Sequence, residues 1–306
     1  MNTRASSNLK TQVVSLCLVG ALATFSACST TTEAQSNDSL ATTDPDTTVR
    51  HTASPRPTVL DTTVPVTTVP PTTVPPTTVP PTTTTLPANV EVVGPWLGSA
   101  LTAVGKQDGP DTKLAQMRLT QLGFWVGELD GEYGFSTTQA VMAFQKYLGL
   151  DPSGKLDQDT TNWLAVFPER AHGTADDGRL VEVDKTKQLL FLIVDGKTTW
   201  TFNTSTGSGI AYVATNRNNG ETESGDAVTP NGLWKVNRER PNGWWEGDLG
   251  DIYRPKYFRG GVAIHGMTRV PNYPASHGCV RLSTAAMDFI WDNDLVPLYT
   301  PVWVHE

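Results

Sequence analysis

A cysteine and two histidines near the end of the chain have the types and spacing that nucleophilic chemistry requires. Cys279 and His277 lie in the heptapeptide 276–282 (SHGCVRL), and His265 lies 14 residues before the cysteine. A thiol becomes a strong nucleophile when it loses its proton, and a nearby imidazole can accept that proton. The sequence therefore predicts a cysteine-nucleophile enzyme in which either His265 or His277 holds the proton.

The other two cysteines do not compete for this role. Cys17 lies inside an apolar N-terminal run and Cys28 lies at its end, so Cys279 is the one cysteine of the region expected to fold. An exported domain with a single thiol forms no internal disulfide. A buried structural thiol is the alternative, but the polar Ser-His-Gly-Cys sequence favours a loop over an apolar strand.

The residues around Cys279 suit acyl chemistry. Gly278 lets the backbone approach a substrate closely, and the amides of Gly278 and Cys279 are candidate donors to an oxyanion. His277 would share a face with the thiol if the backbone between them were extended. His265 comes from another segment, at the end of a strand predicted over 261–264, so its ring can approach the sulfur independently.

The N-terminus has the pattern of an export signal, predicted over residues 1–27. Arg4 and Lys10 give a positive start, and the uncharged run that follows is shorter than the ~20 residues of a membrane span. Cys28 follows Phe-Ser-Ala, which resembles a bacterial lipobox in which the cysteine receives a lipid. An ordinary secretory signal or an uncleaved anchor, with Cys28 incidental, is the alternative.

Residues 28–89 are predicted to form a disordered linker rich in Thr and Pro. Such a segment buries little and favours the polyproline II conformation. At ~3.1 Å per residue, fifty residues would reach on the order of 150 Å, enough to leave a membrane surface and enter a cell wall. The net charge of −8 and the lack of a Lys/Arg-rich run predict no binding to nucleic acid.

The rest of the chain divides by periodicity into two domains. Residues 109–166 have helical spacing, with a second helix expected to begin at a capping box over 136–139. Residues 178–304 alternate as strands do, with a hairpin turn at Asp195-Gly196 and one late helix capped by Ser283. The predicted fold class is multidomain: a small all-α three-helix domain, then a mainly β domain.

Several motifs of the helical domain have spacings that agree together: Leu122-Gly123-Phe124, Asp130-Gly131-Glu132-Tyr133-Gly134, Thr138-Gln139-Ala140-Val141, Phe144-Gln145, Gly149-Leu150, Gly154 and Asp157. On these residues the domain resembles the three-helix peptidoglycan-binding domain of cell-wall enzymes. The resemblance implies peptidoglycan glycan as a partner, although most of the apolar positions are expected to be core.

The β domain resembles the L,D-transpeptidases with their YkuD-type catalytic domain, on His265-Gly266 and on the run 276–281. This resemblance implies that Cys279 is the nucleophile and that His265 is the general acid/base, oriented by the carbonyl of Gly266. It implies that His277 shapes the site. Substrate-binding residues would be Arg281, Ser276, Gly278, Tyr257 and Tyr253, although some members of the family carry Asn at the position of Arg281.

The implied reaction is acyl transfer on peptidoglycan stem peptides without a metal or cofactor. A thioester forms on Cys279 with loss of D-alanine, and an amine of a second stem then gives a 3→3 cross-link. Water as acceptor would make an L,D-carboxypeptidase, and a protein amine would make a protein-to-wall attachment enzyme. Two further alternatives are a zinc site on His265, His277 and Cys279 and an inert wall-binding protein. The expected location is the outer face of the cytoplasmic membrane and the cell wall.

Overall fold

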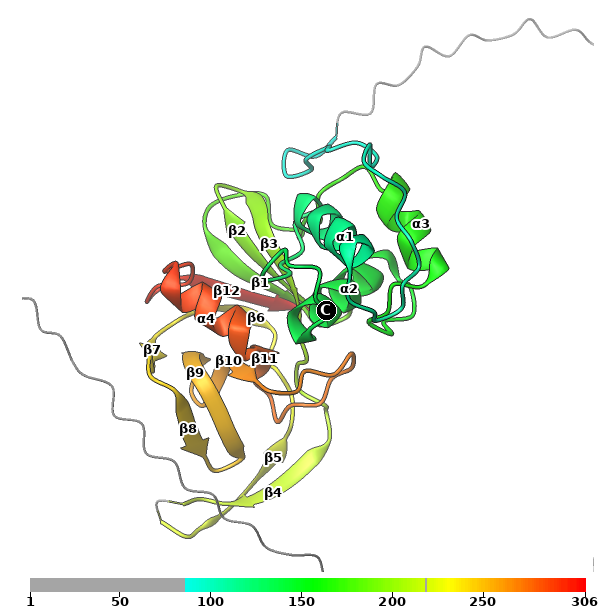
Figure 1. Ribbon diagram of the computed structural model, residues 1–306. Helices are drawn as coiled ribbons and strands as arrows, with labels where there is room; N and C mark the ends of the chain where they lie inside the picture. Colours follow the sequence, from blue (N-terminus) through cyan, green and yellow to red (C-terminus); the bar gives the residue numbers. More distant parts are fainter. Residues whose placement is uncertain (1–85, 218) are drawn as a thin grey trace, which may run out of the picture. The chain divides into compact units, whose positions relative to one another are not determined.

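The computed structural model describes residues 86–217 and 219–306 (Figure 1). The predicted export signal, the predicted lipid site at Cys28 and nearly all of the Thr/Pro-rich linker lie outside the described residues. None of the helices within the described part combines the length and apolar character that crossing a membrane requires.

Three helices come first, as the sequence predicts, and a mainly β domain follows (Figure 1). The helices are α1 (Pro110–Gln121), α2 (Phe135–Leu148) and α3 (Gln158–Val166). Helix α2 ends where Gly149 adopts a left-handed conformation with φ 71°. Helix α3 begins at Asp157, whose side chain accepts a hydrogen bond from the amide of Thr160 at 2.9 Å.

The capping box predicted at Ser136 is wrong. Helix α2 begins one residue earlier, at Phe135, and Gly134 caps it without any side-chain hydrogen bond. The hydroxyl of Thr137, inside the first turn, donates to the carbonyl of Glu132 and accepts from the amide group of Gln116. Tertiary hydrogen bonds thus engage a hydroxyl that sequence pattern assigns to the start of the helix.

The first sheet of the β domain has the strand order β3-β2-β1-β12-β6. Strands β1 and β12 run parallel, and the other neighbours are antiparallel. The predicted turn at Asp195-Gly196 joins β2 to β3, with positive φ at both residues. The bounds are β1 (Leu180–Asp184), β2 (Leu189–Val194), β3 (Lys197–Asn203), β6 (Gly232–Lys235) and β12 (Pro301–His305).

The second sheet carries the segments of the candidate site. Its order is β11-β10-β9-β7, with β8 also paired to β9, and β10 and β11 are parallel. Its strands are β7 (Arg238–Glu239), β8 (Trp244–Gly247), β9 (Gly250–Arg259), β10 (Val262–Met267) and β11 (Val280–Ser283). A separate hairpin pairs β4 (Ala211–Thr215) with β5 (Thr222–Asp226).

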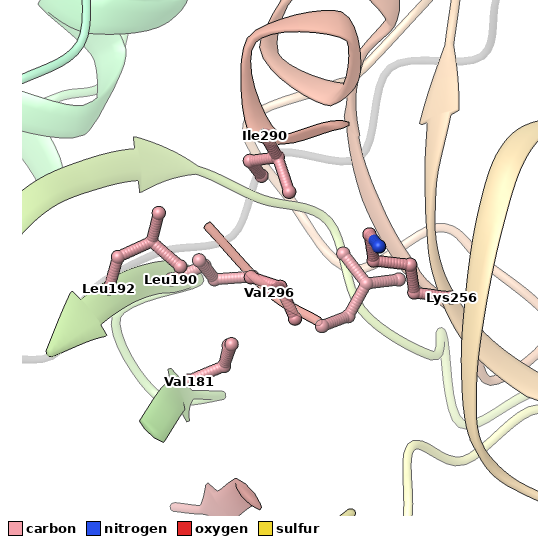
Figure 2. Close-up of a pocket in the computed structure, with 7 residues that line it drawn as sticks. Val181, Leu190, Leu192, Lys256, Ile290 and Val296 are labelled. Atoms are coloured by element: carbon pink, nitrogen blue, oxygen red, sulfur yellow. The ribbon is translucent and has the colours of Figure 1, made fainter. Parts of the chain in front are cut away.

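Helix α4 (Thr284–Asp292) follows β11 directly and packs on the second sheet. Ser283 caps it by accepting from the amide of Ala286 at 3.1 Å, which confirms the predicted cap. Between the two sheets and α4 lies one apolar core. Figure 2 shows a part of it, where Val181, Leu190 and Leu192 approach Ile290, Val296 and the buried stem of Lys256. This space is too small to admit a water molecule and is therefore packing, not a binding site.

Strand β2 is buried on both faces, which explains its unbroken apolar sequence. Leu190 and Leu192 enter the core between the sheets, whereas Leu189, Phe191 and Ile193 pack among the residues of the helical unit. Conversely, Trp125 of the helical unit, which follows α1, packs into the core of the β domain. The helical unit and the β domain therefore share two apolar clusters instead of meeting at a thin linker.

Candidate active site

Strands β10 and β11 bring Cys279 and His265 to one face of the second sheet. Ile264 and Val280 are register partners, and both point into the core. Side chains alternate along a strand, so the flanking residues His265 and Cys279 must point to the opposite face. The candidate base on β10 and the candidate nucleophile, immediately before β11, thus share a face of the sheet. His265 lies within β10, which continues to Met267, not at the strand end that the sequence predicts.

The thiol of Cys279 is held by the backbone of the neighbouring strand. The amide of Ala263 donates to Sγ at 3.4 Å, and the carbonyl oxygen of Gly261 lies 3.8 Å from Sγ. Burial raises the pKa of Cys279, while the Ala263 amide and the charge of Arg281 act in the opposite direction. The resting group is therefore a thiol that needs a base in order to react.

His265 is suited to be that base. Its side chain is 2% exposed, and Nδ1 lies 3.0 Å from the carbonyl oxygen of Gly266, the contact that the family resemblance implies. A carbonyl only accepts, so Nδ1 carries the proton and Nε2 keeps a free lone pair. Burial lowers the pKa of His265 to about 4, opposed by the Gly266 bond and helped by the charge of Arg281. The imidazole is therefore neutral near pH 7.

Gly278 adopts a backbone conformation that favours glycine, with φ 125°, and an added Cβ would lie 3.0 Å from the carbonyl oxygen of Val228. Ser276 is 1% exposed, and its hydroxyl donates to the carbonyl of Cys279 at 2.5 Å and accepts from the amide of Gly278 at 3.0 Å. Ser276 therefore shapes the loop instead of facing a ligand. The Gly278 amide, predicted as an oxyanion donor, is already engaged in this state.

Thr229 fastens the same loop to the neighbouring segment. Its side-chain oxygen donates to the carbonyl of Gly278 and accepts from the amide of Gly207, both at 2.8 Å. The residue is 1% exposed. No local sequence pattern indicates this role of Thr229, because neither of its partners is close to it along the chain.

Arg281 brings positive charge to the face that holds the thiol. It pairs in register with His265, and its Nη1 donates to the carbonyl of Ala275 at 3.0 Å. Within the described part, its Nε is a buried donor that meets no acceptor. A half-buried guanidinium with spare donors is suited to bind a carboxylate.

The remaining predicted residues lie in different surroundings. Tyr257 is opposite Ala263, its ring is 4.0 Å from the Arg238 guanidinium, and burial raises its pKa while the charge of Arg238 acts in the opposite direction. This places Tyr257 beside the thiol. The hydroxyl of Tyr253 instead donates to Asp288 on α4 at 2.9 Å, so this side chain anchors the helix.

His277 is exposed and lies outside the β10–β11 pair. Its ring contacts Tyr212 of β4 edge to face, at 5.4 Å between centroids. The intervening Gly278 is not extended, so the shared face expected for His277 and Cys279 does not follow from strand geometry. Across residues 86–217 and 219–306, no three His, Cys, Asp or Glu side chains are grouped so as to hold a metal ion.

Comparisons with known proteins match both parts of the chain to known families. Residues 178–304 match the YkuD family, the L,D-transpeptidase catalytic domain, and residues 108–164 match a peptidoglycan binding domain family. A crystal structure of an L,D-transpeptidase from Xylanimonas cellulosilytica is 39% identical with a TM-score of 0.59, covering 68% of this chain and 98% of that chain. Another from Stackebrandtia nassauensis is 21% identical with a TM-score of 0.38, covering 69% and 97%.

A curated relative matches over a shorter stretch. The N-acetylmuramoyl-L-alanine amidase CwlM of Mycobacterium tuberculosis is 35% identical over 65 residues, which are 21% of this chain and 16% of the amidase. Fold and site define a two-domain, peptidoglycan-acting enzyme. The chain belongs to the L,D-transpeptidase family. Membership in a family that acts on the cell wall implies an extracytoplasmic location.

Proposed function

We propose that the chain forms 3→3 peptidoglycan cross-links through a thioester on Cys279. The observation that carries the proposal is the neutral His265, with Nε2 free, on the same sheet face as the thiol. Arg281 adds positive charge on that face, where the carboxylate of a donor stem would be bound. Tyr257 lines the site beside the thiol, and His277 shapes its exposed side together with Tyr212.

In the first step Sγ attacks the carbonyl of the peptide bond between diaminopimelate and the terminal D-alanine of a tetrapeptide stem. His265 Nε2 takes the thiol proton and gives it to the leaving amine as the C–N bond breaks. D-alanine departs and a thioester remains. The raised pKa of Cys279 and the lowered pKa of His265 fit proton transfer during attack, without a preformed ion pair.

In the second step a side-chain amine of an acceptor stem attacks the thioester carbonyl. His265 Nε2 takes the proton of the amine and returns it to Sγ as the C–S bond breaks. The product is an amide between two stems, and the free thiol is regenerated. Splitting one acyl exchange into two steps is the advantage of covalent catalysis.

Product analysis with a defined donor and acceptor tests this proposal. Wild-type protein and Cys279→Ala would be incubated with a tetrapeptide muropeptide and the products separated and weighed. We expect cross-linked dimer and free D-alanine from the wild type only. Tripeptide without dimer would identify an L,D-carboxypeptidase. Adducts on an added amine-bearing protein would identify wall attachment, and equal dimer yields from both proteins would refute the mechanism.

We also propose that the chain is exported, lipidated at Cys28 and held at the wall by its helical unit. The first two parts rest on the sequence of residues 1–28, and the third on the peptidoglycan binding family matched by residues 108–164. Mass analysis of the mature N-terminus tests lipidation, since a lipidated Cys28 would begin the mature chain. Co-sedimentation of Cys279→Ala with purified wall sacculi tests the helical unit.

A further inference from the structure

Helix α2 places a buried amine against the β domain. Lys146 is 9% exposed, and its Nζ donates to the carbonyls of Gln188 at 3.2 Å and Thr204 at 3.1 Å. Two carbonyl oxygens match the two N–H groups of a neutral amine. Burial without an opposite charge lowers the pKa of Lys146 to about 7. Burying an amine that can carry a charge costs free energy, so the buried position of Lys146 calls for a structural explanation. Its two hydrogen bonds lead to one.

One of these contacts leads to the strand after Cys279. The carbonyl of Thr204 receives the Lys146 bond, and the Thr204 hydroxyl donates to the carbonyl of Arg281 at 2.8 Å. Ser205 pairs with Arg281 through backbone hydrogen bonds. Arg281 is two residues from the candidate nucleophile, so two hydrogen bonds and two residues of chain connect the amine to Cys279.

The other contact leads to the loop before Cys279. The side chain of Gln188 accepts from the amide of Thr206 at 2.8 Å and donates to its hydroxyl at 2.7 Å. The carbonyl of Thr206 then accepts from the amides of Ala275 and Ser276. Both ends of the Cys279 loop are thus connected to the segment that Lys146 contacts.

A second side chain on the same face of α2 strengthens this arrangement. Gln139 lies seven residues, or two turns, before Lys146. Its amide donates to the carbonyl of Val270 at 3.1 Å, and its oxygen accepts from Asn203 at 2.6 Å. Asn272, in the loop that leads to Ser276, also donates to the carbonyl of Pro152 in the helical unit.

We propose that Lys146 is a positioning residue for the Cys279 loop, acting from the helical unit through Gln188 and the segment 204–206. The helical unit would then help to position the catalytic loop, in addition to the wall binding proposed for it. Of the two measurements that test this proposal, the rate of Cys279 acylation rests on the proposed function, whereas backbone hydrogen exchange does not.

The test compares Lys146→Met, which keeps the apolar stem and removes the amine, with Lys155→Met, an exposed lysine of the same unit. In the full chain, acylation of Cys279 by a carbapenem is followed by mass spectrometry, and backbone hydrogen exchange is measured by peptide. We expect Lys146→Met to slow acylation about tenfold or more and to raise exchange in segments 204–208 and 270–281. Lys155→Met should change neither, and Lys146→Arg, which retains donors, should recover part of the rate.

A second variant guards against a folding defect. Thr204→Val removes the hydroxyl that reaches Arg281 but keeps the carbonyl that receives the Lys146 bond, and Thr204→Ser is its control. We expect Thr204→Val to slow acylation and Thr204→Ser to keep it. Unchanged acylation and exchange in Lys146→Met would overturn the proposal, as would exchange raised uniformly over the chain. If the wild type forms no adduct, the proposed function fails, and local exchange alone decides the role of Lys146.

Discussion

His265 and Arg281 are register partners on the parallel strands β10 and β11, so a positive charge lies beside the candidate base. Burial is the larger reason for the low pKa of His265, and Arg281 lowers it further. Both effects keep the imidazole neutral near pH 7. The candidate base and the candidate carboxylate-binding group are therefore linked by charge as well as by position.

The acylation rate should reflect this neutral base. A pKa of about 4 leaves His265 unprotonated from pH 5 upward, and the free lone pair is lost as the pH falls through about 4. We expect a flat rate from about pH 5 to pH 8 and a fall below it, measured with a carbapenem by mass spectrometry. In His265→Ala the remaining rate should instead rise steadily toward high pH, because only the thiolate fraction can then react. An acid limb of the wild-type pH–rate profile near pH 6.5, instead of near pH 4, would contradict the prediction.

Arg281→Met should move that acid limb to higher pH. Removing the positive charge relieves one of the two effects that lower the pKa of His265, while burial still holds it below 6.5. Arg281→Lys keeps a charge and is the matched control. Arg281→Lys should nevertheless bind the donor stem more weakly than wild type, because lysine cannot form the bidentate carboxylate contact. An acid limb that stays in place in Arg281→Met would show that the charge does not reach the imidazole.

Thr229→Val should loosen the Cys279 loop, whereas Thr229→Ser should not. Valine leaves the amide of Gly207 and the carbonyl of Gly278 without their shared partner in a buried place, at a cost of about 1–3 kcal/mol. Urea unfolding measures the cost, and carbapenem acylation measures its effect on the thiol. Equal stability of the valine and serine variants would mean that the hydroxyl contributes nothing to the loop.

Gly278→Ala should be more damaging to acylation than its size suggests. The positive φ disfavours any side chain, and the new Cβ would meet the carbonyl of Val228 at 3.0 Å. We expect a stability loss of about 1–3 kcal/mol and a large loss of acylation, because the backbone next to the nucleophile must shift. Gly220→Ala, at an exposed turn with positive φ but open space, separates strain from displacement. Equal acylation rates of Gly278→Ala and Gly220→Ala would show that a backbone shift beside Cys279 does not limit the reaction.

Lys146 should make stability depend on pH above neutrality. Its folded pKa of about 7 lies below the unfolded value, so the unfolded chain binds one more proton between about pH 7 and 10.5. The cost of the buried charge is full below pH 7 and disappears as the pH rises through that window. Both partners of Nζ are neutral carbonyls, and the nearby Lys187 pairs with Asp184. Urea unfolding from pH 6 to pH 9.5 should show wild type gaining stability relative to Lys146→Met. A constant difference would place the pKa elsewhere.

Sequence patterns indicate the candidate nucleophile and base more readily than the hydrogen bonds that hold their loop in place. Cys279 and His265 are recognisable because few residue types do nucleophilic work, and strand alternation explains why they share a face. Ser283 is predictable as a cap because its partner is three residues away. By contrast, Thr229 and Gly278 are 49 positions apart, and no local pattern indicates their hydrogen bond.

The same limit explains the errors. The predicted cap, Ser136, lies inside α2, because the helix begins after Gly134 without a side-chain cap. The next residue, Thr137, is held by Gln116, 21 positions away, which no capping pattern can anticipate. No sequence pattern marks Lys146, which is buried because the segments just before β2 and just after β3 lie against α2. Burial is a property of the assembled fold, so it is the property that sequence patterns predict least well.

Strand β2, with one face in each apolar cluster, also limits how the helical unit and the β domain can move relative to each other. A hinge at this boundary would expose apolar residues such as Phe191 and Ile193 to water, and this cost opposes separation of the helical unit from the β domain. Under the proposed wall binding, a glycan bound by the helical unit would then lie at a distance from Cys279 that the fold itself sets.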